Sequence, residues 1–303
     1  MTKKLSVVIV SLAGGGYLER CLKSLCEQKD REDVEIIVPC DDRFTSVTAL
    51  QQKFAEAQII KINGSRTFAE LRSAGFLNAK SPLIALTEDQ CIPDPDWCSR
   101  IIEAHNASHA AIGGAVDKFI GSTESLLSWA VYFCDYSRYA NPLSEGVVRH
   151  LTDCNVSYKR DALMSISQAW SREFHETVVH GALQKQGKQL WISSGIIVKQ
   201  QRRMHFIQAL RERYAFGRLF GSTRVANGSL QTRIFFAVLS ILLPMLLTGR
   251  IAKNLFKKKR YRSEFVRCLP LILVLNLIWS FGEFVGYITA SADSSLSPRE
   301  APV

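Results

Sequence analysis

The chain has 303 residues, of which 47% are hydrophobic and 22% are charged, and its formal net charge is +10. This length suits one large domain with an appendage, or two modest domains. Residues 199–267 carry sixteen Lys and Arg against two Glu, so the rest of the chain is slightly acidic. Because the basic stretch flanks the most apolar segments, it fits anionic lipid headgroups and argues against a nucleic-acid partner.

Short apolar runs alternate with helical patterns over the first 116 residues. Strands are predicted where the chain is continuously rich in Val, Ile and Leu, at residues 5–10, 34–40, 59–62, 83–87 and 111–116. Helices are predicted where apolar residues recur at helical spacing or helix-start signals occur, at residues 17–27, 46–57, 67–79 and 94–107. The alternation predicts a sheet of parallel strands covered by helices.

Polar residues directly follow several of these predicted strands. They are Ser11, Asp41, Asp42, Glu88 and Asp89. Since ligands of open α/β sheets bind beyond the carboxyl ends of the strands, these side chains are the first candidates for a site. Mg²⁺ and Mn²⁺ prefer oxygen ligands, so the acidic pair after the fourth strand suits a divalent metal.

The alternation fades after residue 116. Residues 117–150 hold aromatic side chains without clear periodicity, which either pack in a core or stack on a sugar. Short strands are predicted at residues 156–158 and 190–193, and a basic amphipathic helix at 206–225.

Two apolar segments close the chain, at residues 234–249 and 268–292, and the second contains one charge, Glu283. As a helix the first covers about 24 Å, less than the ~30 Å hydrocarbon core of a bilayer. Two full spans would put the basic residues 250–267 and the main domain on opposite sides of the membrane. The positive-inside tendency puts the basic residues in the cytoplasm, where the main domain is also expected. We therefore expect a re-entrant or interfacial hairpin, with two true spans as the alternative.

The eight cysteines are scattered without a CxxC pair or zinc spacing, and the opening apolar run is too short for a signal peptide. Both features favour reduced, buried thiols and a cytoplasmic compartment.

The segment after the fourth strand carries the most specific pattern in the chain. Thr87-Glu88-Asp89 is followed by Pro93 and then by Pro95-Asp96-Trp97. This pattern resembles the acidic metal-binding motif of family 2 glycosyltransferases, which have the GT-A fold. The resemblance implies that Asp89 binds Mn²⁺ or Mg²⁺ against a nucleotide diphosphate, and that Glu88 lies near the sugar donor.

Other segments resemble the same family in the expected order, over roughly residues 5–225. The resemblance implies that Ser11, Asp41, Asp42 and Arg72 contact the nucleotide sugar. It implies that Glu176, by its distance from Gly187, is the catalytic base that deprotonates the acceptor. Asn155 and His175 are expected at the acceptor, and Arg202, Arg203 and His205 are candidates for a phosphate of donor or lipid.

The chain also departs from that family. It has no Gln-x-x-Arg-Trp, the motif of polymerising synthases, so a single addition is expected. The expected fold is a GT-A-like, Rossmann-like mixed sheet with flanking helices, followed by a hydrophobic helical hairpin. The expected divisions are a catalytic domain (1–198), a basic helical linker (199–233), a membrane hairpin (234–292) and a disordered tail (293–303).

The predicted function is inverting transfer of a sugar from a nucleotide diphosphate to a lipid-linked or glycan acceptor at the cytoplasmic face of the cytoplasmic membrane. The alternative is a non-catalytic membrane scaffold built on a decayed transferase domain, against which the retained Glu88, Asp89 and Glu176 argue. A nucleotidyltransferase would need a second set of metal-binding carboxylates and a Gly-Lys signature, which the sequence lacks.

Overall fold

The computed structural model describes residues 3–11, 14–45, 47–121, 124–226 and 228–291. The chain divides into two compact units, an α/β unit of residues 1–119 and 139–201 and a helical unit of residues 120–138 and 202–303. The first unit thus ends at residue 201, and residues 120–138 belong with the C-terminal helices, which the sequence pattern did not indicate. The predicted disordered tail, 293–303, lies outside the described residues.

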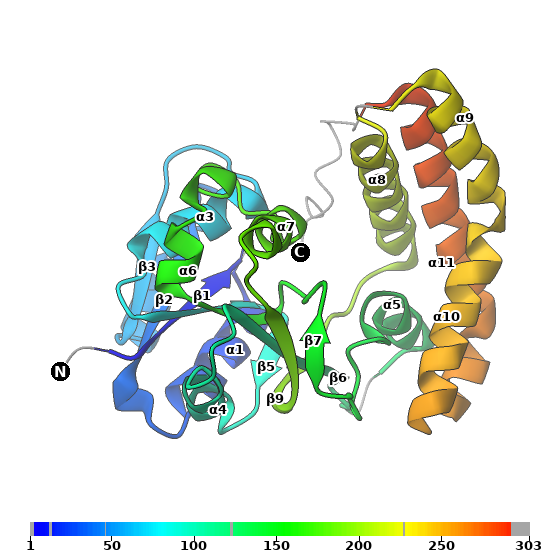
Figure 1. Cartoon of the computed structure of the whole chain (residues 1–303). Helices are drawn as coiled ribbons and strands as arrows, with labels where there is room; N and C mark the ends of the chain where they lie inside the picture. Colours follow the sequence, from blue (N-terminus) through cyan, green and yellow to red (C-terminus); the bar gives the residue numbers. More distant parts are fainter. Residues whose placement is uncertain (1–2, 12–13, 46, 122–123, 227, 292–303) are drawn as a thin grey trace. The chain divides into compact units, whose positions relative to one another are not determined.

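The α/β unit is built on one mixed sheet (Figure 1), which has nine strands among the described residues. Its order is β3-β2-β1-β4-β8-β6-β9-β5, with β7 paired to β9. The strands are β1 Leu5–Val10, β2 Val34–Cys40, β3 Ala57–Lys61, β4 Leu83–Glu88, β5 Cys91–Pro93, β6 Ala111–Lys118, β7 Gly146–Val148, β8 Asn155–Lys159 and β9 Leu190–Gln200.

The first four strands are parallel, and β8 runs antiparallel between β4 and β6. All six residues of β1 are buried, as expected for a strand covered on both faces. In the register of β1 on β4, Val10 lies opposite Glu88. The residues that follow these two strands, Ser11 and Asp89, are therefore neighbours at the carboxyl edge of the sheet.

Helices cover both faces of this sheet. Figure 1 shows α3, α6 and α7 on one face and α1 and α4 on the other. The helices of the unit are α1 Gly16–Cys26, α2 Val47–Lys53, α3 Phe68–Asn78, α4 Trp97–Ala104, α6 Arg160–Met164 and α7 Glu176–Lys185, with 3₁₀ turns η1 Arg31–Asp33 and η2 Ser167–Ala169. The predicted capping box at the start of α3 is present, since Thr67 Oγ1 accepts from the Glu70 N–H and Glu70 accepts from the Thr67 N–H.

Several element boundaries differ from the predicted ones. The helix expected at 46–57 is α2, which ends at Lys53, and β3 begins at Ala57, before the predicted strand. Strand β9 runs eleven residues, far beyond the predicted 190–193, because it pairs with β6, β5 and β7 in turn. Its added length is fixed by partners that are remote in the sequence, which local patterns do not reveal.

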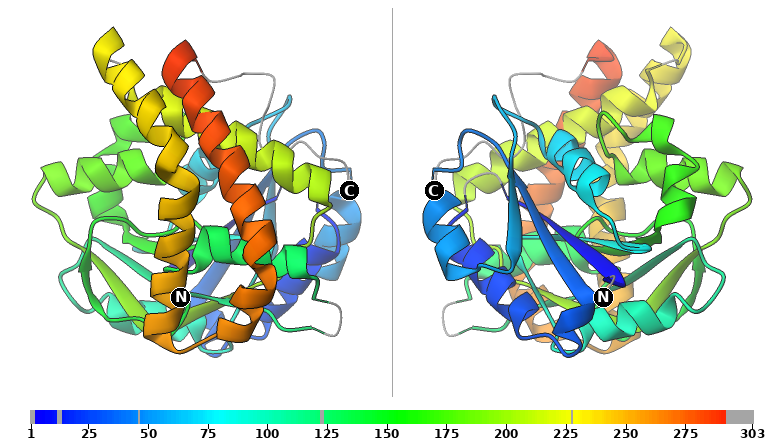
Figure 2. Two further views of the ribbon diagram at one scale, coloured as in Figure 1. Left: turned by 90° about the vertical axis from the view of Figure 1, so that its right-hand side faces the viewer. Right: turned by 90° about the vertical axis from the view of Figure 1, so that its left-hand side faces the viewer.

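The helical unit contains α5 and the C-terminal helices. They are α5 Leu126–Tyr136, α8 Phe206–Arg224, α9 Leu230–Leu239, η3 Ser240–Leu242, α10 Leu243–Lys258 and α11 Arg262–Thr289. Figure 2 shows α10 and α11 side by side as a helical pair. The aromatic residues Trp129, Tyr132 and Phe133 of α5 are buried here against Tyr261 and its surroundings, so they are core residues.

Helix α8 packs directly on α11 through glycines of both helices. A Cβ atom at Gly217 or Gly221 would overlap the backbone of α11, and one at Gly282 or Gly286 would overlap the backbone of α8. Both helices thus carry the small-xxx-small spacing that lets backbones approach closely. The segment predicted as a linker is therefore an integral layer of the helical unit.

Two helical stretches of this unit, Leu230–Lys258 and Arg262–Thr289, are long and apolar enough to cross a membrane by length and composition. Only 22% and 39% of their most apolar windows are buried within the protein. The predicted apolar helical pair is therefore present, and most of its apolar surface is uncovered.

Candidate functional site

The candidate site lies at the carboxyl edge of β1, β2 and β4. Ser11 Oγ, directly after β1, donates a hydrogen bond of 2.6 Å to Asp89 Oδ2, directly after β4. The N–H of Gly14 donates to the same Ser11 Oγ at 3.0 Å. The end of β1 and the acidic motif are thus joined through the hydroxyl of Ser11. This agrees with the register of β1 on β4, which puts Val10 opposite Glu88.

Asp89 is half-buried and offers carboxylate oxygens, the ligand type that Mg²⁺ and Mn²⁺ prefer. Within the described ranges, no cluster of three or more His, Cys, Asp or Glu side chains is placed to hold a metal. A metal at Asp89 would therefore take most of its ligands from a bound molecule and water. That is the usual arrangement for Mg²⁺ held by one or two carboxylates and substrate phosphates, so the donor set fits.

After β2, the two aspartates have different surroundings. Asp41 is fully buried and accepts hydrogen bonds from Arg43 and from the N–H of Arg66. Burial by itself would raise the pKa of Asp41, but these hydrogen bonds outweigh it and hold the pKa below its usual value. Asp42 is exposed and accepts from the N–H of Gly64 at 2.7 Å. Asp41 therefore organises the loop, and Asp42 faces solvent.

Arg72 of α3 joins three carboxylates. Its Nη2 donates to Glu88 Oε1 at 3.2 Å and to Asp153 Oδ2, and its Nη1 lies 3.8 Å from Glu176 Oε2. The side chains of Arg72 and Glu88 are 8% and 5% exposed, whereas Asp153 and Glu176 are 21% and 31% exposed. The predicted donor-side Glu88 and the predicted base Glu176 are thus connected through one buried guanidinium.

An aromatic cluster fixes α3 against the segment that leads into α7. The rings of Phe76 and Phe174 lie 4.5 Å apart, and Trp170 packs on Phe76 at 5.8 Å. The N–H of Phe174 donates to the Ala69 carbonyl of α3 at 2.9 Å. Glu176 is the first residue of α7, two residues beyond this anchor, so the cluster positions it beside Arg72.

The carboxyl group of Glu176 has a raised pKa. Burial is the largest cause, and the negative charge of Asp153 adds to it, while Arg72 acts in the opposite direction. A general base works best when its pKa approaches the operating pH, so this environment strengthens Glu176 as a proton acceptor.

Asn155 is not available to an acceptor, which corrects its predicted role. It is fully buried, its Oδ1 accepts from Trp97 Nε1 at 2.9 Å, and its Nδ2 donates to the carbonyls of Ala115 and Ile196. The side-chain amide of this β8 residue therefore forms hydrogen bonds to β6, β9 and α4 in the interior of the unit. His175 is exposed beside Glu176 and lies 3.2 Å from Glu173.

The predicted phosphate-binding residues Arg202, Arg203 and His205 belong to the helical unit. The Arg202 guanidinium donates to both oxygens of Glu212 at 2.6 and 2.5 Å, an ion pair within that unit. Arg203 and His205 are exposed at the start of α8. A phosphate-binding role for this group stays a prediction.

Asp153 is the site residue that the sequence did not single out. It lies two residues before the start of β8, and β8 runs antiparallel to β4. The amino end of β8 therefore meets the carboxyl end of β4, and Asp153 reaches the edge where Glu88 lies. Inspecting only residues that follow strands misses such a position, although the Asp153-x-Asn155 segment was a usable signal.

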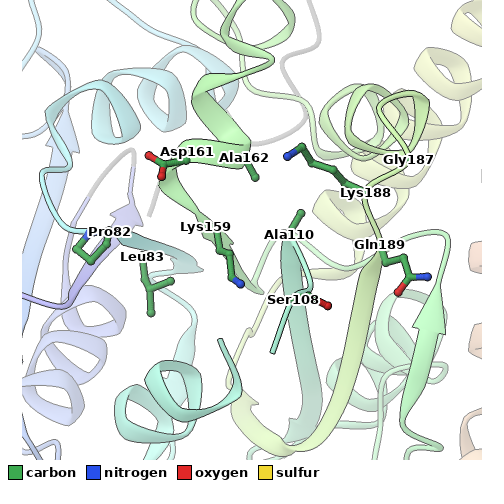
Figure 3. Close-up of a pocket in the computed structure, with 10 residues that line it drawn as sticks. All are labelled: Pro82, Leu83, Ser108, Ala110, Lys159, Asp161, Ala162, Gly187, Lys188 and Gln189. Carbon is green, nitrogen blue, oxygen red and sulfur yellow. The ribbon is translucent and has the colours of Figure 1, made fainter. Parts of the chain in front are cut away.

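A cavity of about 590 Å³ lies at the opposite edge of the sheet (Figure 3). Its lining comes from the start of β4, the residues before β6 and β9, the end of β8 and helix α6, and includes Lys159, Asp161 and Lys188. None of the predicted site residues lines it. It is therefore separate from the carboxylate edge.

A family model described as glycosyl transferase family 2 matches residues 6–167. Among solved structures, the chain is similar to the mannosyltransferase PcManGT from Pyrobaculum calidifontis, in complex with GDP-Man and Mn²⁺. The identity is 12%, the TM-score is 0.53, and the match covers 96% of this chain and 86% of that one. The likeness confirms the predicted GT-A-like fold. No curated protein sequence matches the chain.

Proposed function

Because the chain belongs to glycosyl transferase family 2, we propose that it transfers a sugar from a nucleotide diphosphate donor to an acceptor hydroxyl, with inversion and with a divalent metal. The observation that carries this proposal is the single edge that holds Asp89, Glu88, Arg72 and Glu176. It supplies an oxygen ligand for a metal and a proton acceptor, the two groups that such a transfer needs.

The roles follow from the surroundings of each side chain. Glu176 takes the proton of the acceptor hydroxyl, and the acceptor oxygen forms a bond to the anomeric carbon as the bond to the diphosphate breaks. The nucleotide diphosphate leaves with the electron pair, and the single displacement inverts the anomeric centre. A metal bound by Asp89 would offset the charge of the leaving diphosphate. Asp42, which is exposed, would contact the nucleoside.

The PcManGT structure, with its GDP-Man and Mn²⁺, supports a nucleotide-diphosphate sugar and a divalent ion as ligands here. A thermal-shift panel of nucleotide sugars with Mn²⁺ tests this directly. At least one donor should raise the melting temperature of the wild type and not of Asp89→Ala. Asp161→Ala, altered in the opposite cavity, should respond like the wild type. If wild type and Asp89→Ala respond alike to every donor, the proposed role of Asp89 is wrong.

We further propose that the helical pair attaches the enzyme to the membrane from the cytoplasmic face without crossing it, so that the acceptor is lipid-linked or a growing glycan. Helix α8 supports this, because it packs on α11 from Gly282 to Gly286 and carries Arg211, Arg213 and Arg218. If α11 crossed the bilayer, these charges would lie near the hydrocarbon, at a high cost.

Protease access in sealed vesicles separates the two topologies. The basic turn at residues 257–260 should be cut only from the side on which the α/β unit is also cut. Cleavage of this turn only from the opposite side would establish two true spans.

A further inference from the structure

Asp153 adds a third carboxylate to a site that has one buried guanidinium. Arg72 Nη2 contacts both Glu88 and Asp153, and Arg72 Nη1 is 3.8 Å from Glu176. Three negative groups thus share one cation in a setting where Arg72 and Glu88 are almost entirely shielded from water. Like charges this close disfavour one another's ionised forms.

The charge at position 153 can be removed without changing the size of the side chain. An asparagine there has the same size and could accept the same hydrogen bond from Arg72 without adding charge. Asp153 Oδ1 lies 3.5 Å from the hydroxyl of Thr152. A carboxylate beside two others costs stability that the neutral amide would avoid, so the charge itself requires a reason.

The negative charge of Asp153 acts on Glu176. Tyr158 is buried and close enough for Glu176 to affect its pKa, and it is hydrogen-bonded at 3.0 Å to His180, which is also buried. Burial raises the pKa of Tyr158 and lowers that of His180 to about 4, so both are neutral at pH 7. The charged groups that face Glu176 are Asp153 and Arg72, with titratable His175 beside it on its own segment.

We propose that Asp153 is a positioning residue for the transfer step: it fixes Arg72 between the donor-side Glu88 and the base Glu176, and its negative charge makes Glu176 a stronger proton acceptor. The proposal rests on the proposed function of Glu176. In the step itself, the acceptor O–H bond breaks and its proton moves to a Glu176 oxygen. The freed electron pair of the acceptor oxygen forms the new bond to the anomeric carbon, while the bond from that carbon to the diphosphate oxygen breaks and the nucleotide diphosphate leaves with its electron pair.

Asp153 and Arg72 have opposing effects on the ionisation of Glu176. Asp153 favours the protonated form of Glu176 and Arg72 favours the ionised form, so the base holds a proton firmly enough to take it and remains ionised before the reaction. The same guanidinium contacts Glu88, next to Asp89, so the donor and acceptor sides are held by one side chain. Misplacement by a fraction of an ångström would lower the rate without removing any reacting group.

The test follows the ionisation of Glu176 itself. The full-length protein is labelled with ¹³C at glutamate and aspartate carboxyl carbons, and the Glu176 resonance is assigned by its loss in Glu176→Gln. In Asp153→Asn the Glu176 carboxyl should titrate at lower pH than in the wild type, and in Asp153→Glu close to the wild type. An unchanged titration in folded Asp153→Asn, with a wild-type circular dichroism spectrum, would overturn the proposal.

A second measurement needs no substitution at Asp153. In the wild type, strongly interacting carboxyl groups titrate together, so the Glu176 resonance should show a second inflection at the pH where Asp153 titrates. A single inflection for each group would contradict the proposal even if Asp153→Asn did not fold. Asp96→Asn, which removes a carboxylate paired with Arg100 at 2.7 Å elsewhere in the α/β unit, should leave the Glu176 titration unchanged.

Activity gives an independent reading. Once a donor is found, Asp153→Asn should lower kcat about tenfold through misplacement of Arg72 and the weaker base, with the KM for the donor little changed. Loss of donor binding together with an unchanged titration would overturn the positioning role. A shifted Glu176 titration without transfer to any acceptor would support the inference and count against the proposed function alone.

Discussion

The α/β unit and the helical unit differ in which charged and apolar side chains they bury and which they expose. In the α/β unit, large apolar side chains are exposed at only a few described positions, such as Val147 and Val178, and carboxylates gather at one edge of the sheet. In the helical unit, Ile241 and Met245 are each 71% exposed, whereas Glu283 is buried. The α/β unit thus buries most of its large apolar side chains, whereas the helical unit leaves many of them exposed. Large exposed apolar patches are typical of surfaces that bind a protein or a membrane.

Buried charge also serves different ends in the two units. Glu283 accepts hydrogen bonds from Trp279 Nε1 and Tyr287 Oη on the same helix, and Arg213 pairs with Asp135 at 2.5 Å. These contacts satisfy polar groups between packed helices. Around Arg72 the carboxylates outnumber the cation, which is costly for stability and useful for proton transfer. The proposed chemistry thus belongs to the α/β unit, and the proposed attachment to the helical unit.

The largest expected effect is at Asp89. Asp89→Ala should lower kcat/KM by about 10³-fold or more, because it removes the ligand for the ion that offsets the leaving diphosphate. The rate of nucleoside diphosphate release in Mn²⁺ measures this, with the reaction in EDTA as reference. Asp161→Ala is the control for the same unit. A rate within a few fold of the wild type would place the chemistry elsewhere.

Glu176→Gln should lower kcat by about 10²–10³-fold, since it removes the base, and should leave donor binding intact. Because the pKa of Glu176 is raised by burial and by Asp153, wild-type kcat should fall, as the pH is lowered, at a higher pH than an ordinary glutamate would give. The pH profile of kcat and isothermal titration with the donor measure both effects. Full activity in Glu176→Gln would remove the assignment of the base.

Substitutions of glycine test whether the helical unit depends on close backbone contact. Gly282→Ala should destabilise the α8–α11 pair by about 1–3 kcal/mol, because its Cβ overlaps the Tyr214 carbonyl. Gly249→Ala is the matched control, since its Cβ meets no atom within 4 Å. Hydrogen exchange should quicken in α8 and α11 of the first variant and stay unchanged in the α/β unit. Equal exchange in the two variants would mean that the helices are not closely packed.

The smallest effect is expected at the basic turn. Changing Lys257 and Lys259 to Gln should weaken binding to anionic vesicles by about 1 kcal/mol per residue, and less at high salt. Lys23→Gln, at a side chain 70% exposed in the α/β unit, should bind like the wild type. Co-sedimentation with vesicles of known anionic lipid content measures the change. If Lys23→Gln weakened binding as much, the division of roles between the units would fail.

Local patterns predicted most of the strands and the acidic edge, but not β5, β7 or the full length of β9. The continuous apolar runs at residues 5–10 and 83–87 gave two neighbouring strands, and their register brought Ser11 to Asp89. The segment 120–138 was missed because its helix, α5, joins partners more than 70 residues away, such as Arg213. The role of Asn155 was mistaken because the direction of an amide depends on three strands and a helix, which no local pattern records.

The account depends on a divalent ion held at Asp89 together with a diphosphate. Electron paramagnetic resonance of Mn²⁺ measures this in the intact protein with GDP and with UDP. The wild type should bind about one Mn²⁺ when the preferred nucleoside diphosphate is present, and Asp89→Ala should leave that ion in solution. Equal Mn²⁺ binding by Asp89→Ala and the wild type, with either nucleotide, would contradict the account.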